Sequence, residues 1–335
     1  MKKPKPADIV FIIIVILGAL YFFSPFKPSY DLVPRLYPDI PVYDTHEHMD
    51  EASRIYEFEN IMKEAGVVSV SFLGSPQITF GYGYNFSGYA ENNLELLKLS
   101  EKSEYFTFCT VDTTKLDALN ELKTYLESGG TGLKLYNGHM NVHPIMGQIN
   151  SSELDEIYSF VEDNKIPVIF HVDLFLYFDE FNNAMKKHPN MTVNIPHLGE
   201  DALFGLKNIS FLLDNYPNTY TDISFGIGLS RNLGAISKSP EAARNFIIKY
   251  QDRILFGLDL VVNEENKYID SEFILKNYFC YFNLLEQKDF YCEPYDRFAN
   301  QPGFKKNKLN GLNLDKEVLQ KIYYDNPRKF LGTNS

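Results

Sequence analysis

The sequence predicts an α/β protein, a (β/α)8 barrel of the TIM type that a single N-terminal membrane-anchor helix precedes. After residue 39, short apolar runs alternate eight times with longer segments of helical period, which favours a closed parallel barrel. The chain has 335 residues, more than the roughly 250 that this fold needs. An open doubly wound sheet, the main alternative, usually carries a glycine-rich loop after its first strand, where this chain has His46 and His48.

An apolar run near the N-terminus has the length of a membrane span. Three lysines precede it, and it extends from Ile9 to Phe23, or to Phe26 if Ser24 and Pro25 are included. A spanning helix needs about 17–25 residues. A cleaved signal peptide ends in a small-residue cleavage site, which we do not find after this run. We therefore expect an uncleaved anchor, with a cleaved signal and a buried helix as alternatives.

The anchor divides the chain into four parts. We expect residues 1–8 to be a cytoplasmic tail, residues 9–26 a transmembrane anchor, residues 27–38 a linker and residues 39–335 the barrel. Because lysines flank the anchor on its N-terminal side, the positive-inside rule keeps that side in the cytoplasm. The predicted location is the cell membrane, single-pass, with the catalytic body facing outside.

The barrel strands are predicted from eight apolar or β-branched runs. They are Ile40–Asp44, Val67–Leu73, Tyr105–Val111, Thr131–Tyr136, Pro167–His171, Met191–Ile195, Thr219–Ser224 and Arg253–Leu258. Between them, Lys115–Leu126, Glu153–Asp163 and Ala242–Tyr250 have the apolar spacing of one helix face. The segment Cys280–Asn313 has no clear period, so we expect a loop insertion at the barrel rim, and Asp315–Leu331 returns to helical period.

Charge and cysteine content limit the partners and the redox state. The formal net charge is −12, and an acidic body repels phosphate backbones, so we expect no nucleic-acid partner. Cys109 lies in an apolar strand-like run and is expected in the core. Cys280 and Cys292 would pair outside the cell or remain two free thiols, and the sequence leaves both open.

Histidines stand at the ends of three predicted strands. His46 and His48 are two residues apart, a spacing that puts both side chains on one face of an extended strand. His171 ends the fifth apolar run, and His197 follows the sixth. The carboxyl ends of barrel strands form the catalytic face of this architecture. We therefore expect these imidazoles to meet at one rim.

Two charged residues complete this pattern. Asp259 follows the eighth apolar run, and Lys134 lies within the otherwise apolar fourth run. A buried unpaired ammonium is costly, so Lys134 needs a partner. Imidazole nitrogens and a carboxylate together suit a divalent metal ion, zinc first, with iron or manganese as alternatives.

Six further motifs, in order along the chain, carry a family resemblance. They are Gly132–Tyr136, Ile166–His171, Pro196–Gly199, Tyr220–Ser224, Asp252–Asp259 and Asn326–Gly332. With these motifs and its histidines, the chain resembles the amidohydrolase superfamily, in particular its amidohydrolase-family-2 branch, from about Pro41 to Gly332. The resemblance implies a metal-dependent TIM-barrel enzyme.

The resemblance also implies a ligand set. His46, His48 and His171 would bind the metal, and Asp259 would complete the site and move the proton of the metal-bound water. His197 would be a ligand of a second metal or a group that polarises the substrate. Members of this branch often bind a single ion, so one ion is favoured over two.

The remaining assignments concern catalysis and substrate. By the same resemblance, Lys134 is either carbamylated and bridges two metals or remains an ammonium near the substrate. We count it with His197 and Asp259 as catalytic. Tyr136, which ends the fourth run, and Arg231, after the seventh, are assigned to substrate binding.

The expected function is hydrolysis of an amide, ester or lactone bond in a small molecule by a metal-activated water. A decarboxylase or hydratase on the same scaffold is the first alternative. A non-catalytic barrel that binds at the cell surface is the second. The sequence predicts neither the oligomeric state nor the substrate.

Overall fold

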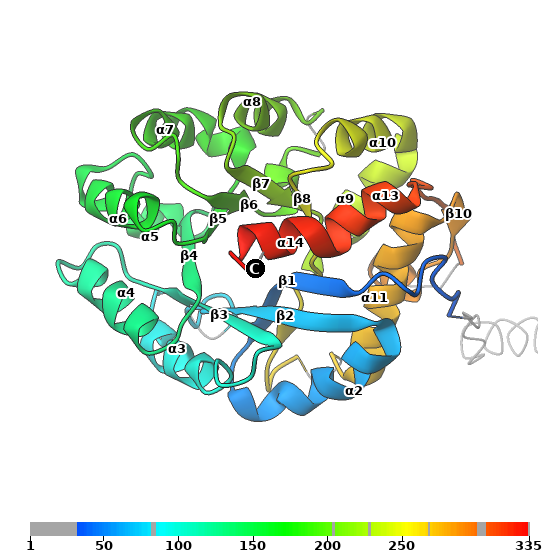
Figure 1. The fold of residues 1–335 in the computed structure, drawn as a ribbon, viewed down its shortest axis with the longest axis horizontal. Helices are drawn as coiled ribbons and strands as arrows, with labels where there is room; N and C mark the ends of the chain where they lie inside the picture. The colour runs from blue at the N-terminus through cyan, green and yellow to red at the C-terminus, as the bar shows by residue number, and fades with distance from the viewer. Residues whose placement is uncertain are drawn as a thin grey trace, which may run out of the picture.

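The computed structural model describes residues 32–81, 85–202, 205–226, 229–266, 269–299 and 306–333 (Figure 1). Of residues 229–231 and 297–299 it describes the backbone alone. Within these ranges, no helix combines the length and the apolar character that a membrane crossing requires. The predicted tail and anchor, residues 1–26, lie outside the described residues, as do residues 27–31 of the predicted linker.

Nine strands of the described chain form one parallel sheet in the order β8-β7-β6-β5-β4-β3-β2-β1-β9. The sheet closes on itself, because Thr45 of β1 donates its backbone N–H to the carbonyl of Phe256 at 2.9 Å, directly after β8. The strands are β1 (Val42–Met49), β2 (Val67–Leu73), β3 (Tyr105–Thr110), β4 (Gly132–Gly138), β5 (Val168–Val172), β6 (Val193–Ile195), β7 (Thr219–Asp222), β8 (Ile254–Leu255) and β9 (Val261–Val262). The TIM-barrel architecture predicted from the sequence is confirmed.

The two ends of the barrel seam differ from the prediction. The first strand was expected to end at Asp44, but β1 continues to Met49 and contains both histidines, because His48 and Met49 pair with β9. The eighth run was expected to be one strand over Arg253–Leu258. Only Ile254–Leu255 of this run is a strand, β8. The chain returns to the sheet beyond the run as β9, which was not predicted, and Asp259 between the two strands has a left-handed backbone with φ of 61°.

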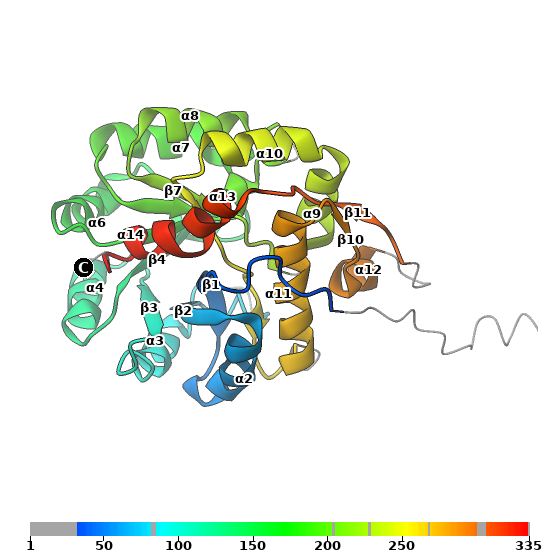
Figure 2. The same ribbon diagram turned by 45° about the vertical axis from the view of Figure 1, so that its right-hand side comes forward.

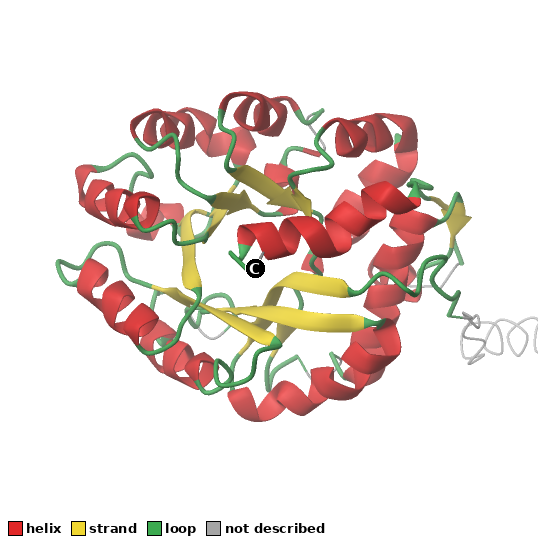
Figure 3. Cartoon of the chain, viewed as in Figure 1, coloured by secondary structure: helices red, strands yellow, loops and turns green. Residues whose placement is uncertain are grey.

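Helices surround this sheet on its outer side (Figure 3). The predicted helical segments correspond to α4, α6 and α10, whose apolar faces pack onto the strands. The described helices are η1 (Ala52–Ile55), α2 (Tyr56–Ala65), α3 (Tyr89–Leu97), α4 (Ala118–Glu127), α5 (His143–Met146), α6 (Ser152–Asp163), α7 (Leu174–Lys187), η2 (His197–Glu200), α8 (Lys207–Asn215), α9 (Leu229–Lys238), α10 (Pro240–Lys249), α11 (Ser271–Glu286), α12 (Glu293–Ala299), α13 (Lys316–Gln320), η5 (Lys321–Asp325) and α14 (Asn326–Phe330).

The segment Cys280–Asn313 was predicted as a loop insertion, and for the first part of the segment that prediction is wrong. Residues 280–286 are the end of α11, which is buried on most of its sides and therefore shows no polar face and no amphipathic period. Tyr278 and Phe282 of this helix stack on Phe256 at the barrel seam. Figure 2 shows α11 beside α12 and the small antiparallel pair β10 (Asp289–Phe290) and β11 (Leu309–Asn310).

Two connections fasten neighbouring segments to α11. Cys280 and Cys292 form a disulfide with Cα atoms 5.3 Å apart, which is the paired alternative of the sequence analysis. In the predicted linker, Arg35 is buried and its Nε lies 3.3 Å from Oε1 of Glu286. The described part of the linker therefore docks on α11 and does not stand free.

The amino-terminal end of the barrel is covered by α14 (Figure 1). Asn326 donates its side-chain amide to the carbonyl of Ile254 at the start of β8. Phe330 stacks on Phe108 and meets Tyr220 edge-on, with ring centroids 6.3 and 5.4 Å apart. Access to the barrel interior is therefore from the carboxyl ends of the strands.

Candidate metal centre

The site begins with two histidines on β1. Successive side chains of a strand alternate, so His46 and His48 point to the same side, and both are almost fully buried. Strand β1 can approach the seam at His46 because Gly257 has no side chain. A Cβ atom at Gly257 would lie 2.8 Å from Cβ of His46. The seam glycine is therefore required by the position of this imidazole.

Asp259 is held opposite these imidazoles in a strained conformation. Its φ of 61° lies in the left-handed region, which non-glycine residues adopt at a cost of order 1–3 kcal/mol. Its N–H donates to the carbonyl of His46 at 2.7 Å, and the next residue, Leu260, donates to Oε2 of Glu47 at 2.9 Å. Strand β1 thus fixes the carboxylate against its own histidines.

Three imidazoles present their Nε2 atoms to this carboxylate. Oδ1 of Asp259 lies 3.3 Å from Nε2 of His46 and 3.0 Å from Nε2 of His48. Oδ2 lies 3.7 Å from Nε2 of His197, the first residue of η2. These contacts join β1, the seam and the segment after β6 at one rim.

The Nδ1 partners of His46 and His197 determine which nitrogen is free. Nδ1 of His46 lies 3.0 Å from Oδ2 of Asp222, and Nδ1 of His197 contacts the carbonyl oxygen of Ser224. A carboxylate and a carbonyl can only accept, so both Nδ1 atoms carry protons. Each Nε2 therefore keeps the lone pair that a metal needs.

His48 has the same tautomer for a different reason. The hydroxyl of Ser75 donates to the carbonyl of Leu73 at 2.9 Å, and it therefore accepts from Nδ1–H of His48 at 2.7 Å. Burial lowers the pKa of His48 to about 4, so this imidazole is neutral near pH 7. Its Nε2 is thus also an acceptor aimed at Asp259.

This donor set fits a divalent metal ion. One ligand atom from each of His46, His197 and Asp259 can be chosen so that all lie within 4.8 Å of one another. Ligands about 2.1 Å from a tetrahedral ion are roughly 3.4 Å apart, and the three nitrogen–oxygen distances here are 3.0, 3.3 and 3.7 Å. Nitrogen lone pairs and a carboxylate that face one another repel unless a proton or a cation lies between them.

The charges of the cluster support this interpretation. Burial alone would raise the pKa of Asp259, but attraction to His46 and His197 and its close contacts with His46 and His48 hold it well below its usual range. Burial and Lys134 lower the pKa of His46, but attraction to Asp259 and Asp222 outweighs them and raises it. A proton and a metal ion therefore compete for Nε2 of His46.

His171 lies beside this group and has a different carboxylate. Its Nε2 is 3.4 Å from Oδ1 of Asp173, and its ring centroid is 5.0 Å from that of His197. On its other side, the ring of His139 lies at 4.6 Å. The compact group thus contains His197 where the sequence analysis placed His171, and the role of His171 as a ligand stays a prediction.

Lys134 of β4 is fully buried, and its partner is a histidine of the cluster. Its Nζ lies 3.4 Å from Nε2 of His46 and 5.0 Å from the ring centre of Tyr136. Burial lowers the pKa of Lys134 to about 8, although the charges of Asp259 and Asp222 oppose the shift. The amine therefore loses its proton more readily than an exposed lysine.

A cavity of about 220 Å³ opens beside the cluster and contains one of the two predicted substrate residues. Tyr136 lines it and donates its hydroxyl to the carbonyl of Gly74 at 3.1 Å. The lining residues are His48, Ile78, Thr79, Tyr136, His139, Asn141, Val142, His171, Asp259 and Val261. Arg231 lies near the start of α9, and its side chain is outside the described part of the chain.

Comparison with known proteins bears directly on this site. A family model described as amidohydrolase matches residues 86–333, or 248 of the 335 residues. The chain belongs to this amidohydrolase family. The match begins after β1, so His46 and His48 lie outside it. Among curated proteins, no match to this amidohydrolase was found.

Solved structures share its fold at low identity. An uncharacterized TIM-barrel protein from Bordetella bronchiseptica is 16% identical, with a TM-score of 0.56 over 87% of this chain and 99% of that one. A protein assigned as 2-pyrone-4,6-dicarboxylic acid hydrolase from Pseudomonas putida is 13% identical, with a TM-score of 0.57 over 88% and 99%. A 4-oxalomesaconate hydratase from Rhodopseudomonas palustris is 15% identical, with a TM-score of 0.52 over 87% and 96%. At these identities the likeness shows the fold alone.

The sequence analysis of this amidohydrolase missed three residues of the site. Asp222 ends β7 in the same way that Asp259 follows the eighth run, so its position after a strand was an available signal. His139 also follows a strand, β4, by one residue. Ser75 had no such signal, because a serine after a strand is common and its contact with His48 depends on the folded barrel.

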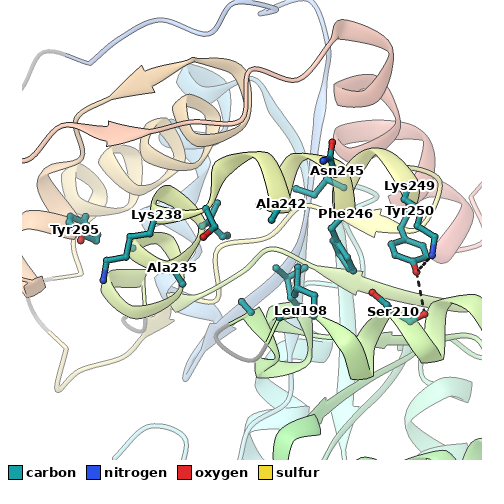
Figure 4. A pocket seen from close by; sticks show the side chains of 18 residues that line it. Leu198, Ser210, Ala235, Lys238, Ala242, Asn245, Phe246, Lys249, Tyr250 and Tyr295 are labelled. Carbon is teal, nitrogen blue, oxygen red and sulfur yellow. Dashed lines mark hydrogen bonds between the residues drawn. The ribbon is translucent and has the colours of Figure 1, made fainter.

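A larger cavity, of about 860 Å³, lies away from these histidines between α8, α9 and α10 (Figure 4). Its polar side chains bond to one another: Lys249 donates to the hydroxyl of Tyr250 at 2.6 Å, and that hydroxyl donates to the carbonyl of Ser210 at 3.3 Å. No cluster of possible metal ligands in the described chain includes its lining residues. The candidate catalytic site of this amidohydrolase is therefore the smaller cavity.

Proposed function

We propose that this chain is a metal-dependent hydrolase that uses a metal-activated water on an amide, ester or lactone bond. One observation carries the proposal: three imidazoles whose Nδ1 atoms are occupied direct their Nε2 atoms at the carboxylate of Asp259. We propose zinc as the first candidate, with iron or manganese as alternatives, and one ion in preference to two.

Different residues of the chain would hold the cation and accept the proton of the attacking water. A divalent cation, when bound, lowers the pKa of a water molecule to about 7 and so supplies a nucleophile at neutral pH. His46, His48 and Asp259 would hold the cation, and His171 is a further candidate ligand. Asp259 is also the base, because its Oδ2 is farther from the imidazoles than Oδ1 and is free to take the proton of the attacking water.

Lys134 and His197 are the candidates to stabilise the oxygen that becomes negative. Lys134 lies 3.4 Å from Nε2 of His46 and donates as an ammonium, whereas His197, 3.7 Å from Oδ2 of Asp259, donates only when its Nε2 has taken up a proton. Donors fixed at this position stabilise the tetrahedral intermediate of acyl transfer. Tyr136 forms one wall of the space that the acyl group would occupy.

The test combines metal analysis with a substrate panel. Purified full-length chain is analysed for bound metal and then assayed with esters, lactones and amides before and after chelation. Metal bound in a fixed ratio, together with hydrolysis that chelation removes and zinc restores, supports the proposal. A chain that binds no metal, or one whose hydrolysis survives chelation, contradicts it.

A lyase reaction, hydration or decarboxylation of a carboxylic acid, is the second candidate. Lys134 favours it, because a buried ammonium beside the cluster would bind a substrate carboxylate. The structural likeness to a hydratase is compatible with it. Release of CO2 from aromatic acids, or water addition to unsaturated acids, that Lys134→Met abolishes would favour the lyase over the hydrolase.

We also propose that residues 9–26 anchor the body to the cell membrane with the barrel outside. The composition of that run supports the proposal, and the Cys280–Cys292 disulfide is compatible with an oxidising exterior. A chain that begins at residue 31 keeps Arg35 on its partner and should be monodisperse without detergent. If that truncated chain still partitions into detergent, the anchor assignment fails.

A further inference from the structure

Three imidazoles line the cavity beside the cluster, and His139 is the one without an assigned role. His139 is the first residue after β4, and its N–H donates to the carbonyl of Tyr136 at 2.9 Å, so a tight turn fixes it at the rim. It lines the cavity together with His48, His171 and Asp259. Its ring centroid lies 4.6 Å from that of His171.

The proton of His139 is on the opposite nitrogen from the protons of the three clustered histidines. The backbone N–H of Asn141 donates to Nδ1 of His139 at 3.1 Å. A backbone amide is always a donor, so Nδ1 must hold a lone pair. The ring proton is therefore on Nε2, and this nitrogen is a donor and not a metal ligand.

This donor has no acceptor within the protein as the structure describes it. None of the described side chains or carbonyl groups is hydrogen-bonded to Nε2 of His139. Asp259, the carboxylate of the cavity, is engaged by His46 and His48. The Nε2–H group is therefore free to donate to a ligand or to a water molecule in the cavity.

The other lining residues restrict the chemistry of that ligand. Among the described residues that line the cavity there is one carboxylate, Asp259, and neither lysine nor arginine. The remaining walls are apolar or carry neutral groups, such as Ile78, Val142 and Thr79. At about 220 Å³ the cavity is smaller than the roughly 300–1,000 Å³ of sites for drug-sized ligands. It suits a small acyl compound without a charge of its own.

We propose that His139 is a substrate-binding residue, whose Nε2–H donates to an oxygen of a small uncharged ester, lactone or amide. The inference rests on the proposed hydrolase and narrows its substrate class. A substrate with a second, ionised carboxylate finds no side-chain cation on the described walls of this cavity, because Lys134 is fully buried against His46 and does not line it. One donor placed on an acyl oxygen also fixes the orientation of the bond that is attacked.

The first experiment needs no substrate. Nitrogen-15 NMR of histidine-labelled full-length chain in detergent distinguishes a protonated ring nitrogen from an unprotonated one, and His139→Phe identifies the resonance. We expect His139 to carry its proton on Nε2 with or without added zinc. A proton on Nδ1, or a zinc-induced change that marks Nε2 as a ligand, would overturn the assignment.

The second experiment measures substrate binding with two matched probes. 4-Nitrophenyl butyrate and the mono-4-nitrophenyl ester of succinic acid differ by a methyl group against a carboxylate. We expect the butyrate to have the higher kcat/KM. We expect His139→Phe to lower kcat/KM for the butyrate by roughly 2- to 12-fold, the effect of one hydrogen bond of about 0.5–1.5 kcal/mol, at unchanged metal content. His139→Gln, which keeps a donor near the Nε2 position, should recover part of the loss.

His143→Gln is the matched control, because His143 lies in the same connection but bonds to Glu180 and stacks on Tyr177 at 4.0 Å, outside the cavity. It should leave kcat/KM unchanged. Unchanged kinetics in His139→Phe, loss of its metal, or a preference for the succinate ester would each overturn the inference. A wild-type chain that binds zinc but hydrolyses neither probe, nor any ester, lactone or amide, would instead overturn the proposed function, and the NMR result would still report on His139.

Discussion

One carboxylate orients two of the clustered histidines, and its removal gives a quantitative test of the metal site. Oδ2 of Asp222 accepts from Nδ1 of His46 at 3.0 Å and from Asn194 at 2.7 Å. Oδ1 accepts from the N–H of His197 at 2.9 Å and from the N–H of Ser224 at 3.1 Å. Asp222→Asn keeps the shape but replaces one acceptor oxygen by an NH2 group.

The cost follows from the tautomer of His46. If the amide oxygen stays on the side with the two backbone donors, the new NH2 group faces Nδ1–H of His46, and two donors cannot bond. His46 must then move its proton to Nε2, the nitrogen that faces Asp259, and so lose the lone pair for the metal. Loss of such a partner typically weakens metal binding by 10- to 100-fold, or about 1.4–2.8 kcal/mol.

The assay is zinc affinity, measured by competition with a chromophoric chelator on the full-length chain. Asp201→Asn is the control, because Asp201 is also a buried aspartate but accepts from the N–H of Asn208 at the start of α8, away from the cluster. Asp201→Asn should leave the zinc affinity unchanged. If Asp222→Asn binds zinc as tightly as the wild type, or both variants lose affinity equally, the orienting role of Asp222 is refuted.

Three further outcomes follow from the described contacts. Asp259→Asn should keep much of its metal but lose roughly 10²–10⁴-fold in turnover, whereas His46→Ala should lose metal and turnover together; elemental analysis beside kinetics decides. Gly257→Ala should lower metal content at nearly wild-type folding, because its Cβ would lie 2.8 Å from Cβ of His46, and wild-type metal content would argue against that close contact. Arg35→Ala should lower the free energy of unfolding by about 3–5 kcal/mol, because it leaves Glu286 buried without its cation. Urea unfolding measures this loss, and a value below about 1 kcal/mol would show that the pair is not a structural anchor.

The barrel could be predicted from the sequence because each strand and helix has a local residue pattern and these patterns repeat along the chain. Val67–Leu73 was predicted with the bounds that β2 has, since an apolar strand between polar helical segments is recognised from its own residues. Helix α11 was missed for the opposite reason. A helix buried on most sides has no period, and only its neighbours, such as Phe256, show why it is apolar throughout.

Most residues of the candidate site were predicted from the sequence, but the contacts between them were not. The two-residue spacing of His46 and His48 was sufficient to place both on one face of β1. The left-handed backbone of Asp259 had no signal, because it results from hydrogen bonds to β1 across more than 200 residues of chain. For the same reason the choice of Nε2 over Nδ1 in each imidazole depends on partners, such as Asp222, that lie far away in the sequence.

The cover that α14 places over the barrel has a consequence for biosynthesis. Phe330, which stacks on Phe108 and meets Tyr220 edge-on, is translated after every strand of the barrel. A chain that folds as it emerges can therefore pair β1 through β7 while the floor of the barrel is still open to water. Until Phe330 is synthesised, the inner aromatic rings stay exposed to water. If a ribosome stalls within the last helices, the released barrel would have an exposed apolar interior and would be a substrate for chaperones and proteases.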